Sequence, residues 1–230
     1  MTRGADDDRR PRGLVFDWDN TLVDSWATIH EALHRTFAAM GHVPWTLAET
    51  KVRVRHSLRD AFPALFGARW EDARKLYLDH FTAIHIERLA PIVGAAELLI
   101  AAKSQGLHLA VLSNKTGRIL RLEAEHLGWT GHFARLVGAG DARADKPDPI
   151  AMGHALEGSG LTGPDVWYVG DTALDMECAV RAGCVGVLLG AGDPEDEGFV
   201  HYPPQRRFAD FTALGRWLRR EPDPPSSGSR

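Results

Sequence analysis

The sequence predicts an α/β fold in which helices cover a parallel sheet and a further group of helices is inserted. Two observations lead to this prediction. Short apolar runs alternate with helical segments through most of the 230 residues, which is the pattern of a doubly wound parallel sheet. Residues 24–92 interrupt this alternation with a stretch that is far too long for a structureless loop.

The apolar runs are the predicted strands. Each run is too short for a helix and is bounded by glycine or polar residues, which favours a buried strand. In chain order the runs are Leu14–Phe16, Leu107–Leu112, Arg135–Gly138, Val166–Val169 and Val185–Leu189. The predicted helices cover residues 94–105, 116–127, 149–158 and 172–182. Gly106, Gly128 and Gly183 stand where three of these helices are expected to end.

The long interval carries helical periodicity of its own. One apolar stripe is formed by Trp26, Ile29, Leu33, Phe37 and Met40. We therefore expect a Rossmann-like core with an inserted α-helical domain. The predicted parts are a core of residues 13–23 and 93–221, a helical insert of residues 24–92, and tails of residues 1–12 and 222–230. The tails are predicted to be disordered from their charged or Pro- and Ser-rich composition.

Composition and charge exclude several classes of partner. A net charge of −4 and a pI near 6.2 give no basic field for nucleic acid. No apolar run approaches the ~20 residues of a transmembrane helix, and the N-terminus lacks the apolar segment of a signal peptide. Cys178 and Cys184 form neither a redox CxxC pair nor a zinc knuckle. We expect a cytoplasmic protein that binds neither nucleic acid nor membrane.

Four polar turns carry the residues with chemical potential. The first follows the strand Leu14–Phe16 and places Asp17 and Asp19 two residues apart. The other three turns are Ser113-Asn114-Lys115, Asp145-Lys146-Pro147-Asp148-Pro149, and Gly170-Asp171-Thr172-Ala173-Leu174-Asp175. Because the carboxyl ends of parallel strands meet at one edge of a sheet, these turns are predicted to converge. Clustered carboxylates repel one another unless a cation joins them, and Mg²⁺ prefers one or two carboxylates with phosphate and water.

These turns resemble, in order and spacing, the four motifs of the haloacid dehalogenase-like hydrolase superfamily, phosphatase branch. The resemblance extends from about residue 13 to residue 190, and the helical insert resembles the α-helical cap of that family. The segment Asp17–Ser25 and the Ser113-Asn114-Lys115 turn are most similar to phosphoglycolate-phosphatase-like members. The resemblance implies a Mg²⁺-dependent enzyme that hydrolyses a small phosphorylated metabolite, with 2-phosphoglycolate as the first candidate.

The resemblance also implies a role for each residue of the first turn. Asp17 attacks phosphorus to form an aspartyl-phosphate and contacts Mg²⁺. Asp19 protonates the leaving oxygen, and its backbone carbonyl contacts the ion. An aspartate at position 19 argues against dehalogenase activity, because the dehalogenase branch lacks it. Asn20 stands at a position where glycine is the commonest residue in the family, and it is expected to adopt a positive φ. Trp18 is expected to point into the core.

The other turns are assigned in the same way. Ser113, Asn114 and Lys146 bind the phosphoryl oxygens, and Lys146 also neutralises charge on the nucleophile. Asp171 ligates Mg²⁺, and Asp175 ligates it through water or orients a neighbour. Within the insert, a basic stretch at residues 51–59 contains Arg55 and His56, which are predicted to bind an anionic group of the substrate such as a carboxylate. The alternative for this stretch is an ordinary solvated face.

Three other functions are compatible with parts of the sequence. A sugar phosphomutase would keep Asp17 and Asp19 but return the phosphate to its substrate. A binding protein would keep the scaffold without activity. A zinc protease is suggested only by His30, Glu31 and His34, which match the HExxH pattern on a predicted helix. That match is weak, because a chain with 11 histidines yields such a pattern readily by chance.

Overall fold

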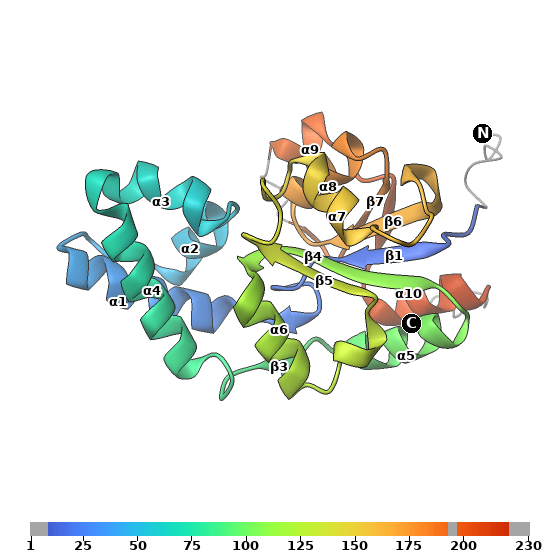
Figure 1. The fold of residues 1–230 in the computed structure, drawn as a ribbon, viewed down its shortest axis with the longest axis horizontal. Helices are drawn as coiled ribbons and strands as arrows, with labels where there is room; N and C mark the ends of the chain where they lie inside the picture. The colour runs from blue at the N-terminus through green and yellow to red at the C-terminus, as the bar shows by residue number, and fades with distance from the viewer. Residues whose placement is uncertain (1–8, 193–196, 221–230) are drawn as a thin grey trace, which may run out of the picture.

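The computed structural model describes residues 9–192 and 197–220 and contains a six-stranded sheet (Figure 1). Every neighbouring pair of strands is parallel. The order across the sheet is β5 (Arg135–Ala139), β4 (His108–Thr116), β1 (Gly13–Phe16), β6 (Val166–Gly170), β7 (Val185–Leu189) and β8 (Arg206–Phe208). The predicted α/β fold is thus confirmed, and all five predicted strands are present.

Helices cover both faces of this sheet, as Figure 1 shows. The core helices are α5 (Ala95–Ser104), α6 (Gly117–His126), α7 (Pro149–Ala155), α8 (Ala173–Arg181), α9 (Gly198–His201) and α10 (Phe211–Arg219). Leu14 and Phe16 of β1 pack into the apolar layer shared with α5 and α10. Val15 points to the opposite layer, which includes residues of α7 and α8. This alternation is what a strand buried on both faces requires.

The predicted helix ends agree with the backbone. Gly106, Gly128 and Gly183 have φ values of 75°, 69° and 69°, in the left-handed region that glycine adopts without a steric penalty. The sequence patterns did not predict β8, α9 or α10. They also did not predict the two-residue strands β2 (Val23–Asp24) and β3 (Ala90–Pro91), which pair antiparallel.

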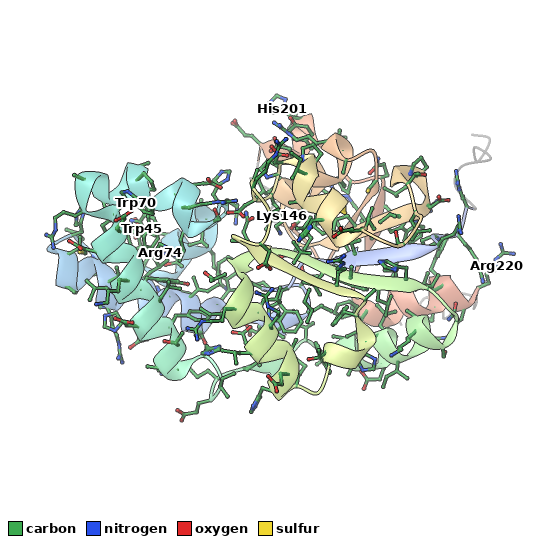
Figure 2. The ribbon with its side chains drawn as sticks, in the orientation of Figure 1. Trp45, Trp70, Arg74, Lys146, His201 and Arg220 are labelled. Carbon is green, nitrogen blue, oxygen red and sulfur yellow. The ribbon has the colours of Figure 1, made fainter. Side chains whose placement is uncertain are left out.

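The residues between β2 and β3 form the helical insert. Its helices are α1 (Trp26–Met40), α2 (Leu47–Arg53), α3 (Leu58–Phe66) and α4 (Trp70–Ile84), with a 3₁₀ turn at Gly67–Arg69 between the last two. The insert has its own apolar core, to which Leu33 and Phe37 of α1 and Tyr77 and Phe81 of α4 contribute. Trp45 and Trp70, labelled in Figure 2, pack against that core. Ile119 of α6 belongs to the same apolar cluster, so the insert packs against the core at this point.

The predicted tails fall mostly outside the described residues. Residues 1–8 and 221–230 are not described, so the tail predicted at 222–230 lies entirely outside. The side chain of Arg9 contacts Asp165 at 2.8 Å, and the N–H of Arg12 donates to the Asp165 carbonyl.

Among the described residues, no helix is both long and apolar enough to cross a membrane. Cys178 and Cys184 are buried and unpaired.

Candidate active site

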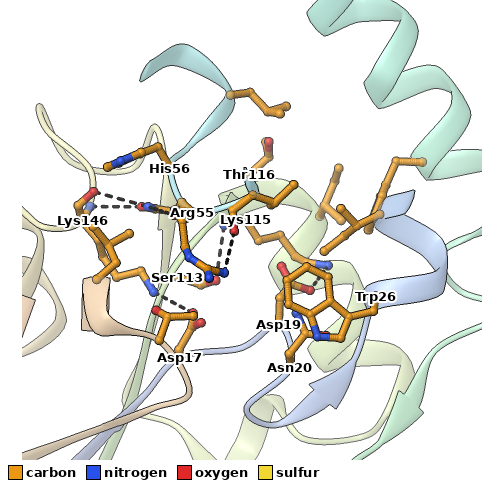
Figure 3. Close-up of a pocket in the computed structure, with 18 of the residues that line it drawn as sticks. Asp17, Asp19, Asn20, Trp26, Arg55, His56, Ser113, Lys115, Thr116 and Lys146 are labelled. Atoms are coloured by element: carbon orange, nitrogen blue, oxygen red, sulfur yellow. Dashed lines mark hydrogen bonds and ion pairs between the residues drawn. The ribbon is translucent and has the colours of Figure 1, made fainter. Parts of the chain in front are cut away.

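The predicted turns do converge at the carboxyl edge of the central strands. Phe16 is in register with Val111 of β4 and Val169 of β6, so the residues that follow these three strands lie level with one another. One difference from the prediction is that the Ser113-Asn114-Lys115 segment lies inside β4, at a shift of register between Leu112 and Thr116. A cleft opens between this edge and the insert (Figure 3).

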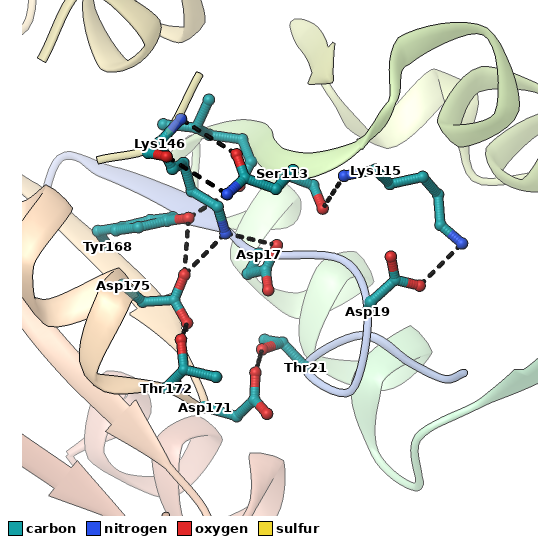
Figure 4. Close-up of polar contacts among 12 residues, drawn as sticks. Asp17, Asp19, Thr21, Ser113, Lys115, Lys146, Tyr168, Asp171, Thr172 and Asp175 are labelled. Carbon is teal, nitrogen blue, oxygen red and sulfur yellow. Dashed lines mark hydrogen bonds and ion pairs between the residues drawn. The ribbon is translucent and has the colours of Figure 1, made fainter. Parts of the chain in front are cut away.

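Lys146 joins two aspartates at the floor of the cleft (Figure 4). Its Nζ lies 2.9 Å from Oδ1 of Asp17 and 2.8 Å from Oδ1 of Asp175. All three side chains are buried. Burial by itself lowers the pKa of Lys146, but the charges and hydrogen bonds of Asp17 and Asp175 outweigh it and raise that pKa. Lys146 is therefore a fixed cation beside the Asp17 carboxylate.

Three carboxylates meet around this lysine. Ligand atoms of Asp17, Asp171 and Asp175 all lie within 4.8 Å of one another. Burial, followed by the charges of Asp175 and Asp19, raises the pKa of Asp17 to about 6 against the opposing effect of Lys146. Burial and the charges of Asp175 and Asp17 raise the pKa of Asp171 well above its usual value. The cluster thus has an excess of negative charge, and its hard oxygen donors suit a divalent cation.

Asp175 differs from the other two because its oxygens are already occupied. Oδ1 accepts from Lys146 at 2.8 Å and from the Tyr168 hydroxyl at 3.1 Å. Oδ2 accepts from the backbone N–H and the hydroxyl of Thr172 at 3.1 and 2.6 Å. The pKa of Asp175 is lowered because Lys146 and Thr172 outweigh its burial. A Cβ at Gly170 would collide with this carboxylate, so the glycine permits its approach. These contacts favour the orienting role over ligation through water.

The first turn has the predicted conformation. Asn20 has a φ of 63°, which confirms the expected left-handed backbone. Its side chain accepts a hydrogen bond from the N–H of Ser25 at 3.1 Å, which ties the turn to the start of α1. Thr21 donates to Oδ1 of Asp171 at 3.0 Å and thereby joins the first turn to the last. Trp18 is fully buried, as expected.

The side chain of Asp19 points away from Lys146 and towards a second lysine, Lys115. The Nζ of Lys115 lies 2.8 Å from Oδ1 of Asp19 and 2.9 Å from Oε1 of Glu123. Sequence reasoning missed Glu123 and assigned no role to Lys115. A signal for Glu123 was present, because it occupies the same helical face as Ile119 and Leu120, which are buried.

Ser113 and Asn114 reach the same edge of the sheet. Ser113 is buried and lines the cleft. The Asn114 amide is bound on both sides: its oxygen accepts from the Lys146 N–H at 3.1 Å, and its nitrogen donates to the Lys146 carbonyl at 3.3 Å. The same nitrogen lies 3.4 Å from the carbonyl of Arg55 in the insert. Asn114 thus holds the Lys146 segment and touches the insert, and these contacts favour a positioning role over the predicted contact with phosphate.

The insert contributes the opposite wall of the cleft. Arg55 and His56 line it, as Figure 3 shows, together with Trp26. The Arg55 guanidinium donates to the carbonyl of Lys51 at 2.7 Å. A further basic residue of the insert, Arg59, lies 2.6 Å from Oδ1 of Asp145, whose carboxylate is almost completely buried in the core. This ion pair joins the insert to the residue that precedes Lys146.

Replacement of Arg59 by Met should raise KM for any substrate that the insert covers. The variant leaves the buried Asp145 carboxylate without its partner and reduces the population in which the insert lies against the core. A rise in KM of about 3- to 10-fold with a smaller change in kcat is expected, since the arginine is partly exposed. Steady-state kinetics measure both constants. Arg74→Met, at an exposed position of α4 (Figure 2), is the matched control; equal effects of the two variants would contradict the role given to the ion pair.

The HExxH residues do not form a metal centre. His30 and His34 lie on α1, and Nδ1 of His30 contacts the Thr50 hydroxyl at 3.0 Å. Glu31 is paired with Arg35 at 2.7 Å. Across residues 9–192 and 197–220, the only cluster of three potential ligands is that of Asp17, Asp171 and Asp175. The zinc-protease interpretation therefore lacks the third protein ligand that a catalytic zinc requires.

Comparisons with known proteins show which proteins this chain resembles. A phosphoglycolate phosphatase of Xylella fastidiosa is 31% identical over 177 residues, covering 75% of this chain and 77% of its own. A phosphoglycolate phosphatase of Rhodospirillum rubrum is 29% identical over 220 residues, covering 90% of this chain and 91% of its own. A putative haloacid dehalogenase-like hydrolase from Bacteroides fragilis superposes with a TM-score of 0.82 at 22% identity, over 89% of this chain and 100% of that one. CbbY from Rhodobacter sphaeroides, solved in complex with phosphate, superposes with a TM-score of 0.78 at 20% identity, over 91% of this chain and 99% of that one.

The family itself follows from a direct match. The model of the haloacid dehalogenase-like hydrolase family matches residues 14–188, which include all four polar turns and the helical insert. The match confirms the resemblance noted from the motifs. This chain belongs to the haloacid dehalogenase-like hydrolase family.

Proposed function

We propose that the protein is a Mg²⁺-dependent phosphatase that hydrolyses a small phosphate monoester through an aspartyl-phosphate. The observation that carries this proposal is the position of Asp17. Asp17 directly follows the last residue of the central strand β1. Its carboxylate contacts Lys146 at 2.9 Å and belongs to the cluster with Asp171 and Asp175. A nucleophile, a fixed cation and a set of hard oxygen ligands are thus combined at one point.

In the first step an oxygen of Asp17 attacks phosphorus, and the bond between phosphorus and the ester oxygen breaks. The leaving oxygen takes the proton of Asp19 and departs as an alcohol, so Asp19 becomes a carboxylate. The phosphoryl group is then bound to Asp17 as a mixed anhydride. Lys146 stays beside this anhydride and offsets the charge of the phosphoryl oxygens.

In the second step water attacks the same phosphorus atom. Asp19 takes a proton from that water, and the bond between phosphorus and the Asp17 oxygen breaks. Asp17 returns as a carboxylate, and inorganic phosphate is released. The sum of the two steps is a phosphate ester plus water giving an alcohol plus phosphate, and Asp19 ends with the proton with which it began.

Asp17, Asp171 and the backbone carbonyl of Asp19 are the groups that would hold Mg²⁺, with Asp175 orienting its neighbours. The ion, when bound, offsets negative charge on the phosphoryl oxygens and on the carboxylates. The excess of carboxylate charge in the cluster and the raised pKa of Asp171 support a cation at this place. Ser113 and Lys146 are the proposed donors to the phosphoryl oxygens, and Asn114 holds the Lys146 segment in position.

The proposed substrate is 2-phosphoglycolate, because the curated relatives compared above carry the name phosphoglycolate phosphatase. That substrate has a carboxylate in addition to its phosphate. Arg55 and His56 line the part of the cleft that the insert provides, where such a group would lie. A cationic side chain there would distinguish glycolate from uncharged alcohols as the leaving group.

Phosphate release from a panel of small phosphate esters, with Mg²⁺ and with EDTA, tests the activity. Release that requires Mg²⁺ and is fastest with 2-phosphoglycolate is expected. If sugar phosphates are isomerised in the presence of a phosphorylated activator while little phosphate is released, the protein is a mutase and the proposal is wrong. If no ester reacts at all, the phosphatase assignment fails.

Replacement of Arg55 by Gln tests the specificity. KM for 2-phosphoglycolate should rise by about 10- to 100-fold, because a charged hydrogen bond of about 1.5–3 kcal/mol is lost. KM for an uncharged alkyl phosphate of similar size should change little. An equal rise for both esters would mean that Arg55 supports the shape of the cleft and does not recognise the carboxylate.

A further inference from the structure

A buried network of polar side chains lies beneath the catalytic turn, on the side away from Lys146. It consists of Lys115, Glu123, His85 and Trp18 around Asp19. None of these four residues has a part in the two chemical steps described above. The Lys115 and Glu123 side chains are 4% and 1% exposed, so their charges have little access to water. Such buried charges are costly unless they are paired.

Lys115 is held from several directions. Its Nζ lies 2.8 Å from Oδ1 of Asp19 and 2.9 Å from Oε1 of Glu123, and it sits 4.5 Å from the ring centroid of Phe81. Because two carboxylates and an aromatic face surround this ammonium group, its position is determined by packing as well as by charge. Figure 4 shows Lys115 extended towards Asp19, on the opposite side of the catalytic turn from Lys146.

Glu123 is the residue that fixes Lys115. Its Oε1 contacts Lys115 at 2.9 Å and Nδ1 of His85 at 2.8 Å, and its Oε2 accepts the indole N–H of Trp18 at 2.6 Å. Glu123 comes from α6 of the core, whereas His85 ends α4 of the insert. The carboxylate is thus held by both domains and by the catalytic turn itself.

The network closes on the catalytic turn at two points. Trp18, between the two catalytic aspartates, bonds directly to Glu123, and Asp19 reaches Glu123 through Lys115. The indole supplies a donor that an aliphatic residue at position 18 could not. With Oδ1 of Asp19 bound to Lys115, Oδ2 is the oxygen left for proton exchange with the ester or with water.

We propose that Lys115 is a positioning residue that holds the Asp19 carboxyl group in the orientation for proton delivery to the leaving oxygen, and that Glu123 holds Lys115 in turn. The proposal rests on the function proposed above, since it gives Asp19 the role of proton donor. Lys115 does not contact the reacting atoms. Its effect is therefore confined to substrates whose leaving group needs a proton as it departs.

That restriction supplies a test with two substrates. The leaving group of an alkyl phosphate is a strongly basic alkoxide unless it is protonated. The leaving group of p-nitrophenyl phosphate is a stable phenolate that departs without a proton. The constant to compare is kcat/KM, because it ends at the first irreversible step and excludes the hydrolysis of the aspartyl-phosphate, in which Asp19 acts on both substrates alike.

Lys115→Met, which keeps the length and apolar stem of the side chain, should lower kcat/KM for the alkyl ester by about 100-fold, as expected when proton transfer is lost. For p-nitrophenyl phosphate the expected loss is less than about threefold, because no proton transfer is involved. Glu123→Gln should also lower kcat/KM for the alkyl ester more than for p-nitrophenyl phosphate, but by a smaller factor than Lys115→Met. Lys103→Met, which removes an exposed lysine of α5, is the matched control and should leave both constants unchanged.

Lys115→Met leaves Glu123 with His85 and Trp18 but without the lysine, so a double variant guards against misfolding. Lys115→Met combined with Glu123→Gln removes both charges together and should show the same selective loss while remaining folded. An equal loss for both esters, or no loss for the alkyl ester, would overturn the positioning role. If the wild-type protein hydrolyses neither ester, the proposed phosphatase function fails, which is a different result from failure of the inference.

Discussion

Asp17→Asn should abolish phosphate release and leave the protein folded. An amide oxygen is a poor nucleophile and its acyl-phosphate cannot form, so kcat/KM should fall by roughly 10⁴- to 10⁶-fold, as for other nucleophile deletions. The fold should tolerate the change, because the substitution removes a buried carboxylate whose pKa is raised to about 6. Lys146 keeps its contact with Asp175 at 2.8 Å in the variant.

Phosphate release and thermal unfolding should be measured on the same preparation. Asp72→Asn, the same substitution at an exposed site of α4, is the control and should behave as wild type. Activity of Asp17→Asn above about 1% of wild type would mean that another group attacks phosphorus, since nucleophile deletions cost far more. A variant that is inactive because it is unfolded would be recognised by its melting curve, and Asp17→Ala would then be used in its place.

The second large effect concerns stability without metal. Burial raises the folded-state pKa of Asp17 from 3.8 to about 6 and that of Asp171 well above its usual value. The folded protein therefore binds protons more tightly than the unfolded chain. The metal-free protein should be most stable below pH 3.8 as far as these two groups are concerned, and should lose stability as the pH rises through 6. The loss from Asp17 alone is about 3 kcal/mol.

Mg²⁺ should offset this loss, because it binds the carboxylates in their charged form. We expect the rise in Tm on addition of Mg²⁺ to be larger at pH 8 than at pH 5. Asp171→Asn should raise the Tm of the metal-free protein at pH 8 and remove most of the response to Mg²⁺. Differential scanning calorimetry with Mg²⁺ and with EDTA measures both effects without reference to activity.

Asp141 provides a control of opposite sign. Its pKa is lowered, because hydrogen bonds from Arg121 and from the Gly138 N–H outweigh its burial. Asp141→Asn should therefore lower stability at pH 8 and leave the response to Mg²⁺ intact. A metal-free Asp171→Asn protein less stable than wild type at pH 8 would contradict the electrostatic account of the cluster.

The parts of the fold that the sequence predicted are those with a local signal. The strands β1 and β6, which end at Phe16 and Gly170, are short apolar runs, and the aspartates that follow them mark the edge of the sheet. The helix α10, which was not predicted, also has such a signal, because Phe211, Leu214 and Leu218 recur at helical spacing. The strand β8 has none, since it is three residues long and begins with two arginines.

The parts of the site that were missed depend on contacts between distant residues. Glu123 meets His85 across 38 positions and Trp18 across 105 positions. Asp145 stands beside Lys146 in the third turn, yet its partner Arg59 comes from the insert. Spacing along the chain carries no information on such pairs, because they form only when the insert is folded and lies against the core. The predicted turns located the chemistry, and the tertiary structure was needed to find what holds it.

The central claim is that Asp17 carries the phosphoryl group, and trapping that intermediate tests it most directly. The protein would be mixed with substrate and Mg²⁺, quenched in acid within milliseconds and treated with borohydride, which reduces an acyl-phosphate to an alcohol. Peptide mass spectrometry should then find homoserine at position 17 in the substrate-treated protein and aspartate there in the control without substrate. Steady phosphate release accompanied by unmodified aspartate at position 17, or by homoserine at another position, would contradict the account.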